Sequence, residues 1–144
     1  MIKYITMTKE FWVNLPVKNI KKSKDFFTQL GFSFNPVPGN SNNSACLVVG
    51  SKNVVIMLFE APAFKSFTNH EITDTKQNTE VLFSIDAENR EEVNQIAVKA
   101  KEAGGIIYNE PEERNGWMYG CGFTDLDGHR WSVLYMDMSK MQKG

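Results

Sequence analysis

The order of predicted elements repeats once along this chain, and that repeat constrains the fold more than any single motif. Apolar periodicity predicts, in order, a strand, a helix and three strands at residues 11–17, 20–30, 32–37, 45–49 and 54–59. The same order returns at residues 80–85, 86–103, 106–108, 117–124 and 130–135. The sequence therefore predicts two βαβββ modules, at about 9–60 and 78–138, joined by a long connection at 61–77.

This repeat restricts how the modules bury their apolar surface. Each module has one helix to cover one sheet face, so its other face must be buried elsewhere. We expect an α+β fold in which residues 1–144 form one domain, with a curved mixed sheet around a cleft. The modules can pair within one chain or between two copies. A cleft walled by both modules is a natural site for a small ligand.

Composition narrows the partners and the compartment. The 144 residues carry 16 Lys and Arg against 17 Asp and Glu, and no segment concentrates basic residues, which argues against nucleic-acid binding. No apolar run approaches the roughly 20 residues that span a bilayer, and the first residues lack the apolar core of a signal peptide. Cys46 and Cys121 are too few for a disulfide framework, so we expect a cytoplasmic protein with reduced thiols.

Local signals fix several element ends. Asn19 is a plausible N-cap for the first helix, and Gly31 supplies its stop. Asp127-Gly128, between two β-rich runs, predicts a tight hairpin turn, because Gly tolerates the positive φ that such a turn needs. His129, in that turn, is expected to be solvated.

Two stretches resemble the vicinal oxygen chelate superfamily of glyoxalase I, bleomycin-resistance proteins, fosfomycin-modifying enzymes and extradiol dioxygenases. They are residues 13–27, followed by Leu30-Gly31-Phe32, and the Asp125-Leu126-Asp127-Gly128-His129 hairpin. Together with the repeated element order, the resemblance covers about residues 10–138. It implies a glyoxalase/bleomycin-resistance-like fold.

The resemblance also implies where a metal ion would bind. Enzymes of that superfamily hold a divalent ion (Mg, Mn, Fe, Ni or Zn) between the first and last strands of each module. The four ligand positions are expected at Trp12, seven residues before Asn19, and at Met57, Glu80 and Ser132. Only Glu80 is an ordinary ligand for such ions, and one protein ligand is too few. We therefore predict no metal ion and no other cofactor.

Trp12 and Met57 allow two interpretations. Their position along the strands is opposite to that of Val13 and Ile56, which are expected to face the helix. They either line an aromatic or apolar pocket in the cleft or simply fill the core.

Glu80 needs a partner if it lies on an enclosed apolar wall, because a buried carboxylate must pair, bind a donor or take up a proton. We predict that Glu80 lies within reach of Arg130, which shares the face of Ser132, or of a polar side chain such as Asn14. Glu80 is also the one candidate for a general base, and no electrophile or metal accompanies it. Whether the protein is an enzyme is left open.

The cleft is expected to be closed by aromatic residues. The glycines in residues 117–122 allow close backbone approach, and Trp117 or Tyr119 is a candidate to close one end. Phe64 and Phe67, in the connection, either form a lid or anchor the connection to the core. The full set of candidate ligand-binding residues is Trp12, Asn14, Met57, Phe59, Glu80, Leu82, Trp117, Tyr119, Arg130 and Ser132.

Two functional hypotheses follow from the resemblance. The first is a metal-free binding protein similar to the bleomycin-resistance branch, which sequesters an aromatic or cationic drug-like molecule. The resemblance implies a homodimer whose clefts are completed at the interface. The second is a metal-dependent lyase or dioxygenase that uses a divalent ion and ligands outside the four expected positions.

Overall fold

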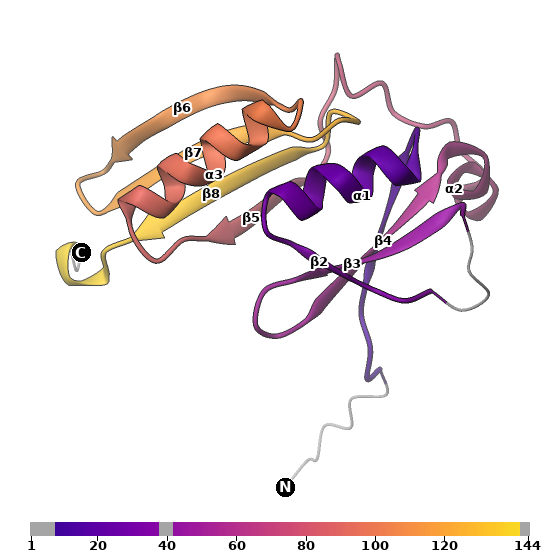
Figure 1. The fold of residues 1–144 in the computed structure, drawn as a ribbon, viewed down its shortest axis with the longest axis horizontal. Helices are drawn as coiled ribbons and strands as arrows, with labels where there is room; N and C mark the ends of the chain where they lie inside the picture. Colours follow the sequence, from indigo (N-terminus) through magenta and orange to yellow (C-terminus); the bar gives the residue numbers. More distant parts are fainter. Residues whose placement is uncertain (1–7, 38–41, 142–144) are drawn as a thin grey trace, which may run out of the picture.

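The computed structural model describes residues 8–37 and 42–141, which contain the two predicted modules (Figure 1). The first module comprises β1 (Val13–Val17), α1 (Ile20–Gln29), β2 (Ser33–Asn35), β3 (Ser44–Val49) and β4 (Val54–Glu60). The second comprises β5 (Leu82–Asp86), α3 (Arg90–Glu102), β6 (Ile106–Arg114), β7 (Met118–Thr124) and β8 (Arg130–Met136). The α+β class and the repeated order of elements are confirmed.

Each module forms its own four-stranded mixed sheet. The strand orders are β1-β4-β3-β2 and β5-β8-β7-β6. In both sheets the first strand pairs in parallel with the last, and the other neighbours are antiparallel. The curved sheet expected around a cleft is thus divided in two, because the modules meet through side chains and a hairpin rather than through a shared β-ladder.

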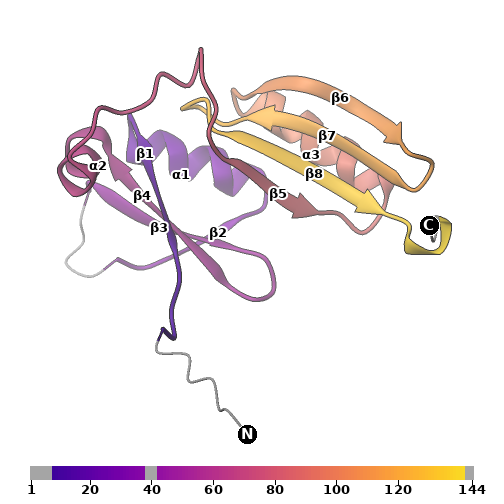
Figure 2. The ribbon, with the colours of Figure 1, turned by 180° about the vertical axis from the view of Figure 1, so that it is seen from behind.

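Both long helices cover the same side of the molecule, as Figure 1 shows, so the opposite sheet faces are turned toward the viewer in Figure 2. We call these opposite faces the open faces. Helix α1 begins as predicted, with the Asn19 side chain accepting a hydrogen bond from the backbone N–H of Lys22 at 2.9 Å. Gly31, at φ 98°, follows its last turn.

The core is continuous between the modules. Helix α1 belongs to the first module, yet the ring of Phe26 lies 6.3 Å from that of Phe123, and the ring of Phe27 lies 5.5 Å from that of Trp131. Trp131, in β8, is only 1% exposed and is stacked parallel to Phe123. One helix therefore supplies aromatic side chains to both halves.

The β7–β8 hairpin joins the modules by hydrogen bonds. Asp127 accepts from the backbone N–H of Lys18 at 2.8 Å and from the hydroxyl of Ser23 at 3.3 Å. Gly128 has the predicted positive φ, 82°. His129 is half-buried and its Nε2 lies 2.8 Å from the carbonyl oxygen of Pro16, so the expectation that it is solvated is wrong. The turn between β7 and β8 thus links the two modules by hydrogen bonds.

The structure differs from the sequence prediction in several elements. The connection contains a short helix, α2 (Ala61–Thr68), which the sequence pattern did not reveal because none of its residues is buried. Strand β6 extends to Arg114, beyond the predicted 106–108, helix α3 begins at Arg90 and not at 86, and β5 starts two residues later than predicted. None of the described helices is long and apolar enough to cross a membrane.

Candidate functional site

The open face of the first sheet brings together three of the predicted ligand-binding residues. Met57 and Phe59 alternate along β4 with the buried Ile56 and Leu58, and Trp12 immediately precedes β1. They line a hollow of about 430 Å³ with Glu10, Phe11, Asn53 and Val55. Because Trp12 is 52% exposed, the alternative in which it fills the core is wrong.

Glu80 does not lie where the sequence placed it. Leu82 is the first residue of β5 and pairs with Arg130, so Glu80 lies outside the strand. It is exposed and makes no hydrogen bond or ion pair with any residue that the structure describes. The predicted contact between Glu80 and Arg130 is therefore wrong. Glu80 and Asn14 do line the same pocket, of about 360 Å³, between the modules.

The helix caps show why this assignment failed. Asn19 and Asn89 are the N-caps of equivalent helices, each accepting from a backbone N–H of the first turn. The residue seven positions before Asn19 is Trp12, and the residue seven positions before Asn89 is Leu82. The position equivalent to Trp12 is therefore Leu82, which is 55% exposed. Counting seven residues back from Asn89 would have identified Leu82 from the sequence alone.

None of the four expected positions then offers a carboxylate or an imidazole. They are occupied by Trp12, Met57, Leu82 and Ser132. Within residues 8–37 and 42–141, no group of three His, Cys, Asp or Glu side chains is close enough to hold a metal ion.

The open face of the second sheet is built differently, around Tyr108 in β6. The guanidinium carbon of Arg130 lies 4.3 Å from the centre of the Tyr108 ring. The Tyr108 hydroxyl donates to the carbonyl oxygen of Trp131 at 3.0 Å. A Cβ added at Gly122 would lie 2.5 Å from two carbons of that ring, so only glycine lets the ring lie across the strand.

Tyr108 remains a hydrogen-bond donor at neutral pH. Burial raises the pKa of its phenol, and the positive charges of Arg130 and Arg114 oppose that rise. The neighbouring strands add two hydroxyls, because Ser132 pairs with Gly122 on one side and with Ser84 on the other. Tyr108 and Ser84 were not among the predicted residues; the glycines in 117–122 were the one sequence signal for this arrangement.

Tyr119 is placed away from this face. Tyr119 lies on the helix side of β7, where its hydroxyl donates to Asn94 Oδ1 of α3 at 2.7 Å. A role for Tyr119 in closing the cleft is therefore wrong, and the cause is the alternation of β7, which gives Tyr119 the face of Cys121 and Phe123. Trp117 lies in the β6–β7 turn, where its carbonyl accepts from the backbone N–H of Asp137.

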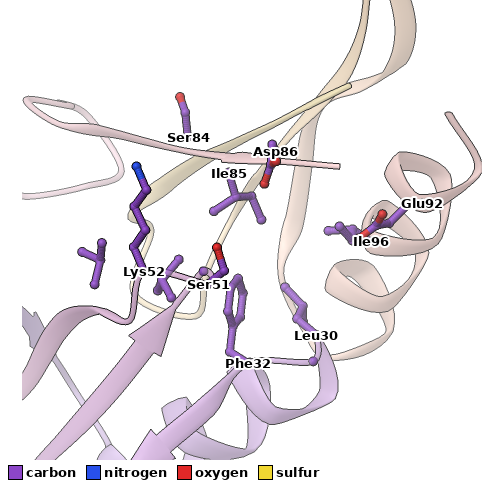
Figure 3. A pocket seen from close by; sticks show the side chains of 13 residues that line it. Leu30, Phe32, Ser51, Lys52, Ser84, Ile85, Asp86, Glu92 and Ile96 are labelled. Carbon is purple, nitrogen blue, oxygen red and sulfur yellow. The ribbon is translucent and has the colours of Figure 1, made fainter. Parts of the chain in front are cut away.

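A further hollow, of about 600 Å³, lies at the junction of the modules (Figure 3). Leu30, Phe32 and Ile85 give it apolar walls, and Lys52 and Asp86 contribute opposite charges. It contains none of the predicted site residues.

Comparison with known proteins identifies the family. Residues 9–50 match the family model described as bleomycin resistance protein-like N-terminal. The hypothetical protein SA1046 from S. aureus is 32% identical with a TM-score of 0.81, over 90% of this chain and 95% of that chain. A glyoxalase/bleomycin resistance protein/dioxygenase family enzyme from Burkholderia phytofirmans PsJN is 17% identical with a TM-score of 0.71, over 87% of this chain and 96% of that chain. The chain therefore belongs to one family with SA1046, and its match to the bleomycin resistance protein-like model agrees with the resemblance to the vicinal oxygen chelate superfamily.

A solved structure with a named function shares only the fold with this chain. The fosfomycin resistance protein FosX from Listeria monocytogenes is 15% identical with a TM-score of 0.65, over 94% of this chain and 98% of that chain. No curated protein sequence matches significantly. The resemblance drawn from the two sequence motifs is confirmed.

Proposed function

We propose that this superfamily member binds a small organic molecule with an aromatic or apolar body, and that it does so without a divalent metal ion. The observation that carries the proposal is the identity of the four positions at which metal ligands are expected. The indole of Trp12 and the alkyl chain of Leu82 offer no lone pair to a metal. The thioether of Met57 prefers soft ions, and the neutral hydroxyl of Ser132 is a poor ligand.

The same residues suit a flat apolar molecule. Trp12 and Phe59 supply aromatic faces, and Met57 between them supplies a flexible, polarisable side chain. The hollow of about 430 Å³ that they line lies within the range of small-molecule sites, about 300–1,000 Å³. The cationic ligand considered from sequence depended on Glu80 lying on the cleft wall, and the exposed position of Glu80 gives it no support.

A homodimer is part of this proposal. Leu82, Ile106 and Met136 are exposed apolar residues on the open face of the second sheet. A second copy placed against them would cover apolar surface and enclose the ligand between two sheets. We place this function in the cytoplasm, where Cys46 and Cys121, both free, would stay reduced.

The proposal is tested with one neutral aromatic probe and a series of metal ions. We expect 2-naphthamide to quench tryptophan fluorescence and to raise the melting temperature, whereas Ni, Zn, Mn and Fe(II) leave it unchanged. Trp12→Ala should abolish the naphthamide effect. Val98→Ala, at an exposed apolar residue on α3, is the matched control and should leave it intact.

Two results would contradict the proposal. One is stoichiometric metal in protein purified without chelators, together with several degrees of stabilisation by one of the ions, which would favour a metal-dependent lyase or dioxygenase. The other is naphthamide binding that survives Trp12→Ala.

A further inference from the structure

We infer that the open face of the second sheet carries an oxyanion subsite, formed by the guanidinium of Arg130 and the hydroxyls of Ser132 and Ser84. The ligand would then be an organic anion, with a carboxylate or similar group attached to its apolar body. This inference rests on the proposed binding function and on the proposed homodimer, in which the second sheet of one copy would face the hollow of the other, and it specifies the charge of the ligand.

The first observation is that the guanidinium of Arg130 has no carboxylate partner among the described residues. Arg130 is half-buried, and no carboxylate among the described residues forms an ion pair with it. The acids on the same face lie elsewhere: Asp86 is opposite Leu134, four residues further along β8, and Glu112 lies 3.8 Å from Arg114. A partly desolvated cation that lacks an internal carboxylate favours an anionic ligand.

The second observation is a pair of hydroxyls beside that cation. Ser132 lies two residues after Arg130 on the same face of β8, and Ser84 is its cross-strand partner in β5. Neither hydroxyl makes a hydrogen bond within the described part of the chain. Two hydroxyl donors and a planar guanidinium fork match the lone pairs of a carboxylate.

The third observation is that the cation is held in place before a ligand arrives. The Tyr108 ring, on which Arg130 is stacked, is fixed by its hydrogen bond to the Trp131 carbonyl and by its contact with Gly122. A pre-positioned donor loses less conformational entropy when an anion binds.

Arg90 provides the contrast within the same chain. Its guanidinium is also stacked on tyrosines, 5.6 Å from the Tyr119 ring and 5.5 Å from the Tyr135 ring. Arg90, however, donates to Glu113 through Nε at 2.7 Å and also through Nη2, and it lies on the helix side of the sheet. The carboxylate that pairs with Arg90 comes from the protein itself, whereas Arg130 has no such partner among the described residues.

The experiment compares three probes of nearly equal size: 2-naphthoate, 2-naphthamide and 2-naphthylmethylammonium. By titration calorimetry, naphthoate should bind most tightly to the intact protein, with an affinity that falls as salt rises. Arg130→Gln should weaken naphthoate roughly tenfold to a hundredfold, since a hydrogen bond to a charged group is lost, and should leave naphthamide unchanged. Arg90→Gln is the matched control and should change none of the three affinities, once its thermal unfolding shows that it is folded.

The outcomes separate this inference from the function on which it rests. If naphthamide or naphthylmethylammonium binds as tightly as naphthoate, or if Arg130→Gln weakens naphthoate no more than Arg90→Gln does, the oxyanion subsite is overturned while aromatic binding stands. If none of the three probes binds, the proposed function itself is overturned.

Discussion

The two modules share an order of elements but not the chemistry of their open faces. The first sheet presents Trp12, Met57 and Phe59, which are aromatic or apolar. The second presents Arg130 stacked on Tyr108, next to two serine hydroxyls. The helix-covered faces, by contrast, are apolar in both modules, with Leu58 at the centre of one and Val133 at the centre of the other.

This difference separates two kinds of constraint. Positions that face α1 or α3 must fill a shared core at crystal-like density, so their apolar character is retained in both modules. Positions on the open faces pack against no helix of their own module and are free to specialise. The repeat therefore defines the fold, and the departures from it define the site.

The largest expected effect comes from the core that both modules share. Phe27→Ala should destabilise the protein by about 3–5 kcal/mol, because it removes a fully buried ring in contact with Trp131 of the other module. Urea unfolding should remain a single transition. Phe11→Ala, at an aromatic residue that is 80% exposed, should change stability by about 0.5 kcal/mol or less. Two separate transitions in Phe27→Ala would show that the modules are independent.

A smaller effect on stability tests the close contact between Gly122 and the Tyr108 ring, which only the second module contains. Gly122→Ala should cost about 1–3 kcal/mol, because its Cβ would meet the Tyr108 ring. Tyr108→Ala in the same chain should recover part of that loss, so a double-mutant cycle from urea midpoints should show coupling. Strictly additive effects would mean that the ring does not constrain position 122.

The hydrogen bonds that Asp127 accepts from the first module should contribute less to stability. Asp127→Ala should cost about 1–2 kcal/mol, since it removes the acceptor for the N–H of Lys18 and the hydroxyl of Ser23. Asp74→Ala is the control, because the Asp74 carboxylate accepts only from the backbone N–H of Lys76 in its own turn. Melting temperatures of the two variants measure the difference. Equal shifts would show that the contact between modules adds nothing.

The smallest effect concerns the two thiols, one in each module. Burial raises the pKa of Cys121 to about 11, so its thiol should stay protonated and unreactive at pH 8. Cys46 is only half-buried, at the open face beside Met57. Brief iodoacetamide treatment should therefore add one group, at Cys46, by intact mass and peptide mapping, and two groups after denaturation. Modification of Cys121 in the folded protein would contradict its burial.

Signals within a few residues predicted much of the fold. The cap at Asn19, the turn at Gly128 and the alternation of β4 around Met57 are local features that a sequence displays directly. Helix α2 was missed because its short sequence buries no residue and so lacks a periodic apolar face.

The site depended on pairings that a single sequence does not display. Glu80 was placed on the cleft wall by an estimate of where β5 begins, and a two-residue difference in that start removed it from the strand. The stack of Arg130 on Tyr108 joins residues 22 positions apart across three strands. Gly122 was recognisable as a point of close approach, but nothing local identified the ring that approaches it.

The position of helix α1 also limits how this chain can be divided. Phe26 and Phe27 belong to the first half of the chain, but their rings pack against aromatic residues of the second half. Cleavage in the connection would give two fragments that each expose an incomplete interior. We expect such fragments to be soluble together and to aggregate apart, as halves that complement one another rather than as autonomous units.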